Sequence, residues 1–214
     1  MNLKSLILAT AALTLIGCQS TYFGALESMG IHKREILIDR IEDAQEAQVE
    51  GQEQFKNALE RFKSVVNFDG GELEENYYLL NDEFEQSEKA ATTIRDRIDS
   101  VDSVAEALFE EWESELDQYT NANLRRDSLR QLKATQKRYS KLMTAMRRAE
   151  KSIDPVLDTL RDNVLYLKHN LNARAINSLK SELSNVNRNV NVLIKAMDQA
   201  ISESDSFIKQ LKQE

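Results

Sequence analysis

Apolar side chains recur at alternating intervals of four and three residues from Leu37 onward. The first stripe comprises Leu37, Ile41, Ala44, Gln48, Gly51, Phe55, Ala58, Phe62 and Val65. Such spacing is typical of a helix that packs lengthwise against other helices. We interpret Gln48, the polar member, as a side chain that fixes the register of a bundle or marks its edge, and a contact to a ligand is the alternative.

The same spacing resumes after residues 67–71 (Asn-Phe-Asp-Gly-Gly), which form a clear turn signal. The second stripe comprises Leu73, Tyr77, Leu80, Phe84, Ser87, Ala91, Ile94, Ile98, Val101, Ala105, Leu108 and Trp112. It predicts a helix from about Glu72 to about Gln118, roughly 70 Å long. A second turn is expected at residues 118–122, with Thr120 or Asn121 as the N-cap of the following helix.

The third stripe keeps its register across Pro155. It comprises Leu132, Thr135, Tyr139, Leu142, Met146, Ala149, Ile153, Leu157, Leu160, Val164, Leu167 and Leu171. Either a new helix starts at a Ser152 or Asp154 cap, or one helix bends at Pro155. The register slips between His169 and Ala173, which predicts a turn before the last stripe. That stripe comprises Leu179, Leu183, Val186, Val190, Leu193, Met197, Ala200, Ser204, Phe207 and Leu211.

The distribution of glycine and proline supports long helices. All six glycines lie at or before Gly71, and Pro155 is the single proline. Both residues are the least favourable in helix interiors and the most useful in the turns that a sheet needs. The sequence therefore predicts an all-α fold, an elongated antiparallel bundle or coiled coil of three to four long helices. We expect residues 31–214 to form this bundle as a single domain.

Charged residues predict that two of these helices pair as a hairpin. Residues 106–117 are rich in acidic side chains, and residues 125–138 are rich in basic side chains. If residues 118–122 form the turn, the two strips face each other and form an inter-helix charge zipper. Its candidate members are Glu106, Glu110, Glu113, Asp117, Arg125, Arg126, Arg130, Lys133 and Lys137. Contact of the basic strip with phosphate or lipid is the alternative.

The first seventeen residues resemble a secretory signal. Lys4 precedes an apolar run from Leu6 to Ile16 that is too short to span a bilayer stably. Leu15-Ile16-Gly17-Cys18 is similar to the bacterial lipobox, in which a cysteine thiol receives diacylglycerol and the chain is cut before it. We therefore expect residues 1–17 to be removed, Cys18 to be lipidated, and residues 18–30 to form a tether. The alternative is an ordinary signal peptide followed by a chance cysteine.

The anchor and the charge of the chain define the expected location. Gln19 follows Cys18 where an aspartate tends to retain lipoproteins of enteric-type bacteria at the inner membrane. We therefore expect an outer-membrane lipoprotein facing the periplasm, with diacylglyceryl-Cys18 as its membrane contact. The formal charge of -8 argues against general affinity for nucleic acid. A single cysteine also excludes an internal disulfide.

The sequence contains no pattern that indicates catalysis. His32 and His169 are the only histidines, and an up-and-down bundle would place them near opposite ends, so we expect no metal site. No nucleophile elbow or glycine-rich phosphate loop is present. We therefore expect neither an enzyme nor a bound cofactor.

Four segments resemble a bacterial family catalogued as domain of unknown function 2959. They are residues 30–48, 63–77, 102–119 and 154–175. The resemblance covers essentially the whole chain after Cys18. It implies a helical body and carries no mechanism.

Two classes of function fit these observations. The first is a structural spacer or protein-interaction adaptor of the cell envelope, which meets a partner protein through its helices and could self-associate along its apolar stripes. The second is a ligand-binding or regulatory periplasmic module. Its cleft between helices would be lined by Gln48 and by the small residues Ala44, Gly51 and Ala58.

Overall fold

The protein is helical throughout the part that the computed structural model describes, which is residues 32–67 and 73–213. The helices are α3 (Lys33–Val66), α4 (Leu73–Leu116), α5 (Ala122–Lys151), α6 (Asp154–His169) and α7 (Ala173–Leu211). No strand occurs within these described ranges. The prediction of an all-α bundle is confirmed.

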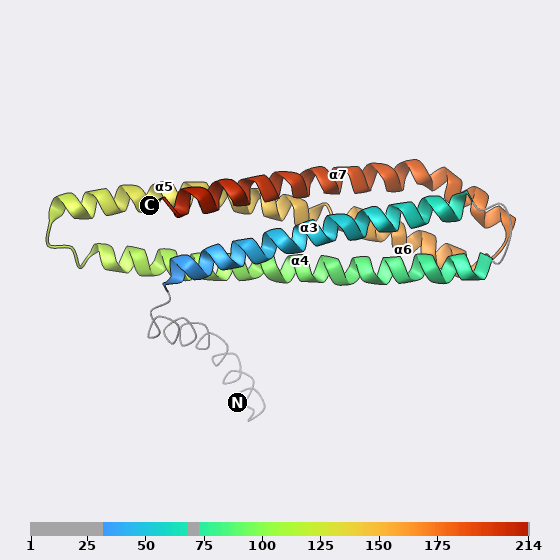
Figure 1. Ribbon diagram of the computed structural model, residues 1–214, viewed down its shortest axis with the longest axis horizontal. Coiled ribbons are helices and arrows are strands. Elements are labelled where there is room, and N and C mark those ends of the chain that lie inside the picture. The colour runs from blue at the N-terminus through green and yellow to red at the C-terminus, as the bar shows by residue number, and fades with distance from the viewer. Residues whose placement is uncertain (1–31, 68–72, 214) are drawn as a thin grey trace, which may run out of the picture.

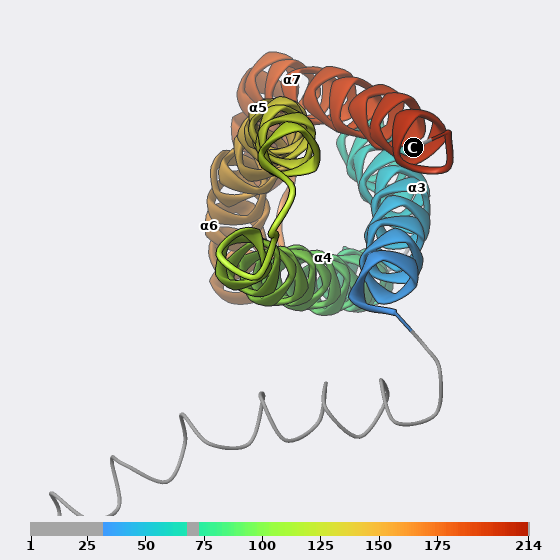
Figure 2. The same ribbon diagram turned by 90° about the vertical axis from the view of Figure 1, so that its left-hand side faces the viewer.

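The helices form an elongated antiparallel bundle (Figure 1). Helices α5 and α6 run end to end and together take the place of one long helix. Viewed along the axis, α3, α4, the α5–α6 pair and α7 form a ring in which each packs on two neighbours (Figure 2). This is the up-down-up-down arrangement that short connections favour.

The predicted stripes form the core. All nine positions of the first stripe are buried in α3. In α4 the stripe is fully buried from Ser87 to Ala105, whereas Leu73, Tyr77, Leu108 and Trp112 near its ends are only partly buried. The four-and-three spacing therefore locates the interior well, because it follows the face that each helix turns toward its neighbours.

The third stripe is divided between α5 and α6 at Ile153. The backbone N–H of Ser152 donates to Ala149 O at 3.0 Å and that of Ile153 to Glu150 O at 3.0 Å, bonds that tighten the last turn of α5. Pro155 lies in the first turn of α6, where a missing N–H is tolerated. The N-cap is Ile153, so the expected cap at Ser152 or Asp154 is wrong. Ile153 is fully buried, and the stripe therefore continues through the break.

A turn after His169 separates α6 from α7. Asn172 is the N-cap of α7, and its side chain accepts hydrogen bonds from the backbone N–H groups of Arg174 (3.0 Å) and Ala175 (3.2 Å). The expected turn is confirmed. Placing Leu171 in the third stripe is wrong, because it lies in this turn with 43% of its surface exposed.

The hairpin between α4 and α5 projects from one end of the bundle. In Figure 1 it extends past the start of α3 and past the C-terminus. Asn121 caps α5 and accepts hydrogen bonds from Asn123 N at 2.9 Å and Leu124 N at 3.3 Å, which confirms one of the two predicted caps.

Among the helices described here, none combines the length and apolar character needed to cross a bilayer.

Candidate functional site

The residues of the predicted lipid anchor lie outside the described part of the chain. Leu15, Ile16, Gly17 and Cys18 precede residue 32, as do the proposed signal and tether. The structure does fix where the chain enters the bundle. Lys33 begins α3 at the end that carries the α4–α5 hairpin, and its Nζ lies 3.0 Å from Glu111 Oε1. Anything joined to the start of α3 is therefore attached at the hairpin end.

The hairpin brings one predicted zipper pair together. Arg125 Nη2 lies 2.8 Å from Asp117 Oδ1, and Arg125 Nε donates to Leu116 O at 3.0 Å. Arg126 and Arg130 instead contact Asn123 and Asp127 on their own helix.

The other zipper positions are exposed. Glu113 Oε1 accepts a hydrogen bond from Gln136 Nε2 at 2.9 Å, a partner that charge counting could not identify. Glu106, Glu110, Lys133 and Lys137 are exposed, so their pairing remains a prediction. Exposed pairs contribute about 0–1 kcal/mol each.

A stronger polar cluster joins α4 to α5 further along the hairpin. Arg147 Nη1 lies 2.7 Å from Asp99 Oδ1 and 2.9 Å from Glu150 Oε2, and Arg147 Nη2 lies 3.3 Å from Asp102 Oδ2. Burial alone lowers the pKa of Arg147, but the bonds to Glu150 and Asp99 raise it on balance. The apolar stripe does not predict this cluster, because Asp99 and Asp102 are not among its positions.

Tyr139 connects this cluster to the core. Its hydroxyl donates to Asp102 Oδ1 at 2.6 Å, and its ring lies edge-on to Phe109 and Phe207, with centroids 5.4 and 6.2 Å away. Burial and the bond to the Asp102 carboxylate raise the pKa of Tyr139 far above its usual value. The phenol therefore stays protonated and ties α4, α5 and α7 together.

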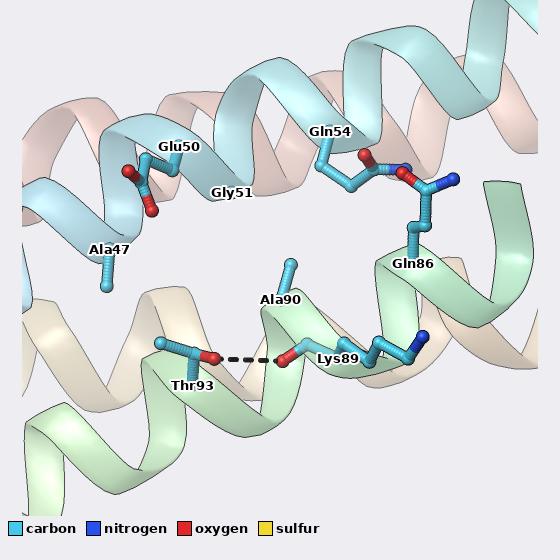
Figure 3. A pocket seen from close by; sticks show the side chains of 8 residues that line it. All are labelled: Ala47, Glu50, Gly51, Gln54, Gln86, Lys89, Ala90 and Thr93. Carbon is cyan, nitrogen blue, oxygen red and sulfur yellow. Dashed lines mark hydrogen bonds between the residues drawn. The ribbon is translucent and has the colours of Figure 1, made fainter.

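The small-residue stripe of α3 does not form the expected cleft. Ala44, Gln48 and Ala58 are no more than 1% exposed and belong to the core, so a cleft lined by them is wrong. Gly51 borders a groove of about 300 Å³ between α3 and α4, beside Ala47 and Ala90 (Figure 3). A Cβ at Gly51 would lie 2.6 Å from Ile94 Cδ1, so glycine serves here to let the two helices approach.

A second groove lies between α6 and α7. Its volume is about 430 Å³, within the usual range for ligand sites. It is lined by Thr159, Asp162, Asn163, Tyr166, Ser178, Leu179, Ser181, Glu182 and Asn185. Every lining residue except Leu179 carries a hydroxyl, amide or carboxylate group. The groove could not be predicted from the sequence, because its two walls come from different stripes.

The histidines are separated as expected. His32 precedes α3 at the hairpin end, and His169 ends α6 at the opposite end of the bundle (Figure 1). Within the residues described, no group of three or more His, Cys, Asp or Glu side chains is arranged to hold a metal ion.

A family model described as "Protein of unknown function (DUF2959)" matches residues 22–211, which include all five helices from α3 to α7. No curated protein matches the chain.

Proposed function

The chain belongs to the family DUF2959, whose function is unknown, and on that premise we propose that it is a lipid-anchored cell-envelope protein acting as a spacer or protein-interaction adaptor. The lipobox-like sequence Leu15-Ile16-Gly17-Cys18 is the observation that carries the proposal. An apolar run stands directly before it, as export requires. Several acyl chains on Cys18 would hold the protein on a membrane, since each buried CH₂ contributes roughly 0.8 kcal/mol.

The position of α3 supports an orientation on that membrane. A short segment joins Cys18 to Lys33, and Lys33 lies at the hairpin end. The hairpin end then faces the membrane, and the α6–α7 turn lies at the far end. Helix α4 has 44 residues and spans about 65 Å. The bundle could therefore hold a partner well away from the bilayer. Gln19 favours the outer membrane, with the bundle in the periplasm.

Metabolic labelling with radioactive palmitate tests the anchor. The wild-type chain should take up label and fractionate with outer membranes. Cys18→Ser removes the acceptor thiol and should abolish labelling, so that precursor retaining residues 1–17 accumulates. Ser20→Ala is the matched control and should behave as wild type. Equal labelling of Cys18→Ser and wild type would contradict the anchor.

Crosslinking in intact cells tests the adaptor function. A photoreactive residue at exposed positions such as Val49 or Val192 should capture an envelope protein. The same residue at Leu37, which is fully buried, is the control and should capture none. A chain that stays monomeric and yields no crosslinked partner from any exposed position would argue against an adaptor.

The groove between α6 and α7 favours a second candidate, a ligand-binding periplasmic module. Its lining residues are polar except for Leu179, and its volume suits a small ligand.

A further inference from the structure

We propose that the groove between α6 and α7 binds a saccharide through its hydroxyl and N-acetyl groups. This inference concerns the bundle itself and does not depend on the lipid anchor. It rests on the shape of the groove, on the chemistry of its lining, and on the hydrogen bonds that hold the lining side chains in place.

The lining disfavours anionic and purely apolar ligands. The nine lining residues include Asp162 and Glu182 but no lysine, arginine or histidine. An anion such as a phosphate ester would meet two carboxylates without a lining cation to balance them. A purely apolar ligand would displace water from the carboxylates of Asp162 and Glu182 without replacing its hydrogen bonds, which is costly. A neutral, hydroxyl-rich ligand matches these groups best.

The floor of the groove combines one polar and one apolar residue. Asn163 is 6% exposed and Leu179 is 1% exposed. The Asn163 amide donates to Thr159 O at 2.7 Å, which fixes the plane of its side chain. An oriented amide can bond to the acetamido group of an N-acetylated sugar, and Leu179 offers a surface for the methyl group.

Tyr166 supplies a face for a sugar ring at the mouth of the groove. It is 38% exposed, and its hydroxyl lies 3.4 Å from Ser178 Oγ on the opposite helix. Tyrosine combines an apolar ring with a polar tip, which suits the mixed surface of a saccharide.

Bonds within the groove hold the other side chains before any ligand arrives. Thr159 Oγ1 donates to Pro155 O at 2.7 Å and accepts from Asn189 Nδ2 at 3.1 Å. Ser181 Oγ donates to Ser178 O at 2.6 Å. Asn185 contacts Glu182 and accepts a bond from Arg188 at the edge. Side chains ordered in advance lose less entropy on binding.

Saturation-transfer NMR on the full chain in detergent micelles tests this site, with tri-N-acetylchitotriose as the probe. Wild-type protein should transfer saturation to the N-acetyl methyl protons of the probe. Tyr166→Ala should raise the Kd by about tenfold. Tyr78→Ala is the matched control, because Tyr78 is 56% exposed on α4, outside the groove, and it should bind as wild type.

A second variant keeps the test decisive if Tyr166→Ala perturbs the fold. Ser181 is exposed, so Ser181→Arg should fill the groove without disturbing the core, and circular dichroism should report unchanged helicity. Loss of transfer in this folded variant supports the site.

No transfer to the probe with wild-type protein, or equal transfer with both groove variants, would overturn the proposal. Equal displacement of the probe by cellotriose, which has no acetamido group, would overturn the role proposed for the N-acetyl groups. Binding of spermidine in place of the probe would overturn it in favour of a cationic ligand.

Discussion

Among individual residues, the polar members of the core differ in whether their bonds are satisfied. Ser87 Oγ donates to Glu83 O at 2.7 Å, and Ser204 Oγ donates to Ala200 O at 2.9 Å, so short side chains bond to their own helix. Gln48 is fully buried, and within the described part of the chain its Oε1 and Nε2 have no hydrogen-bond partner. An unsatisfied buried group costs about 1–3 kcal/mol. Gln48 therefore lowers stability, which fits a side chain that fixes register.

Replacing Gln48 with leucine should stabilise the bundle. Gln48→Leu removes two unsatisfied polar atoms and introduces an apolar side chain of similar size, so the free energy of unfolding should rise by about 1–3 kcal/mol. Gln52→Leu is the control and should destabilise, because Gln52 Nε2 donates to Asp198 Oδ1 at 2.8 Å. Urea denaturation of the soluble form from Gln19 onward measures both. A less stable Gln48→Leu protein would show that the Gln48 amide is satisfied in solution.

Tyr139→Phe should destabilise the protein by about 1–3 kcal/mol, because it removes the bond to the Asp102 carboxylate. The pKa of Tyr139 is raised in the folded state, so this stability is complete below about pH 10. Above pH 10 the unfolded chain releases the proton first and unfolding becomes easier. The difference between wild type and variant should therefore shrink at pH 11. Tyr78→Phe, at an exposed site, is the control. A difference that grows at pH 11 would contradict this assignment.

At the scale of the helices, close packing of α3 on α4 depends on Gly51. Alanine is favoured over glycine in a helix by about 1 kcal/mol. An added methyl at Gly51 would nevertheless meet Ile94 Cδ1 at 2.6 Å, inside a core where Ile94 is fully buried. Overpacking costs about 1–3 kcal/mol, so the clash outweighs the gain in helix propensity.

A double-mutant cycle tests this packing. Gly51→Ala alone should lower stability by up to about 2 kcal/mol. Ile94→Val removes Cδ1 and should cost about 1 kcal/mol alone. In the double variant, the new methyl group at position 51 occupies the space left by Ile94 Cδ1. The double variant should therefore lose less stability than the two single variants added together, by about 1 kcal/mol or more. Additive effects in thermal unfolding would place Gly51 away from Ile94.

The helices could be predicted from the sequence because the spacing of apolar residues in each segment depends only on the buried face of that one helix. All nine stripe positions of α3 are buried, and Asn121 caps α5 as expected. Leu171 could not be placed, because a turn without glycine or proline leaves the stripe without a clear end. The salt bridges of Arg147 and the α6–α7 groove depend on side chains brought together by packing between helices. Spacing within one helix contains no information about them.

At the scale of the whole molecule, the bundle has two different ends. The chain enters α3 beside the α4–α5 hairpin (Figure 1). The polar groove is lined by residues of α6 and α7 close to the turn that joins these helices. A lipid at Cys18 would place the hairpin near the membrane and hold the groove away from it. This arrangement connects the proposed anchor with the proposed saccharide site, although each can be tested alone.

The anchor is the central claim, and mass spectrometry of the N-terminal peptide tests it most directly. Protein purified from membranes of the producing bacterium should yield a peptide that begins at Cys18 and carries diacylglycerol on the thiol and an acyl chain on the amine. Residues 1–17 should be absent from the mature protein. A peptide that begins at any other residue, or an unmodified Cys18 thiol in membrane-derived protein, would contradict the account.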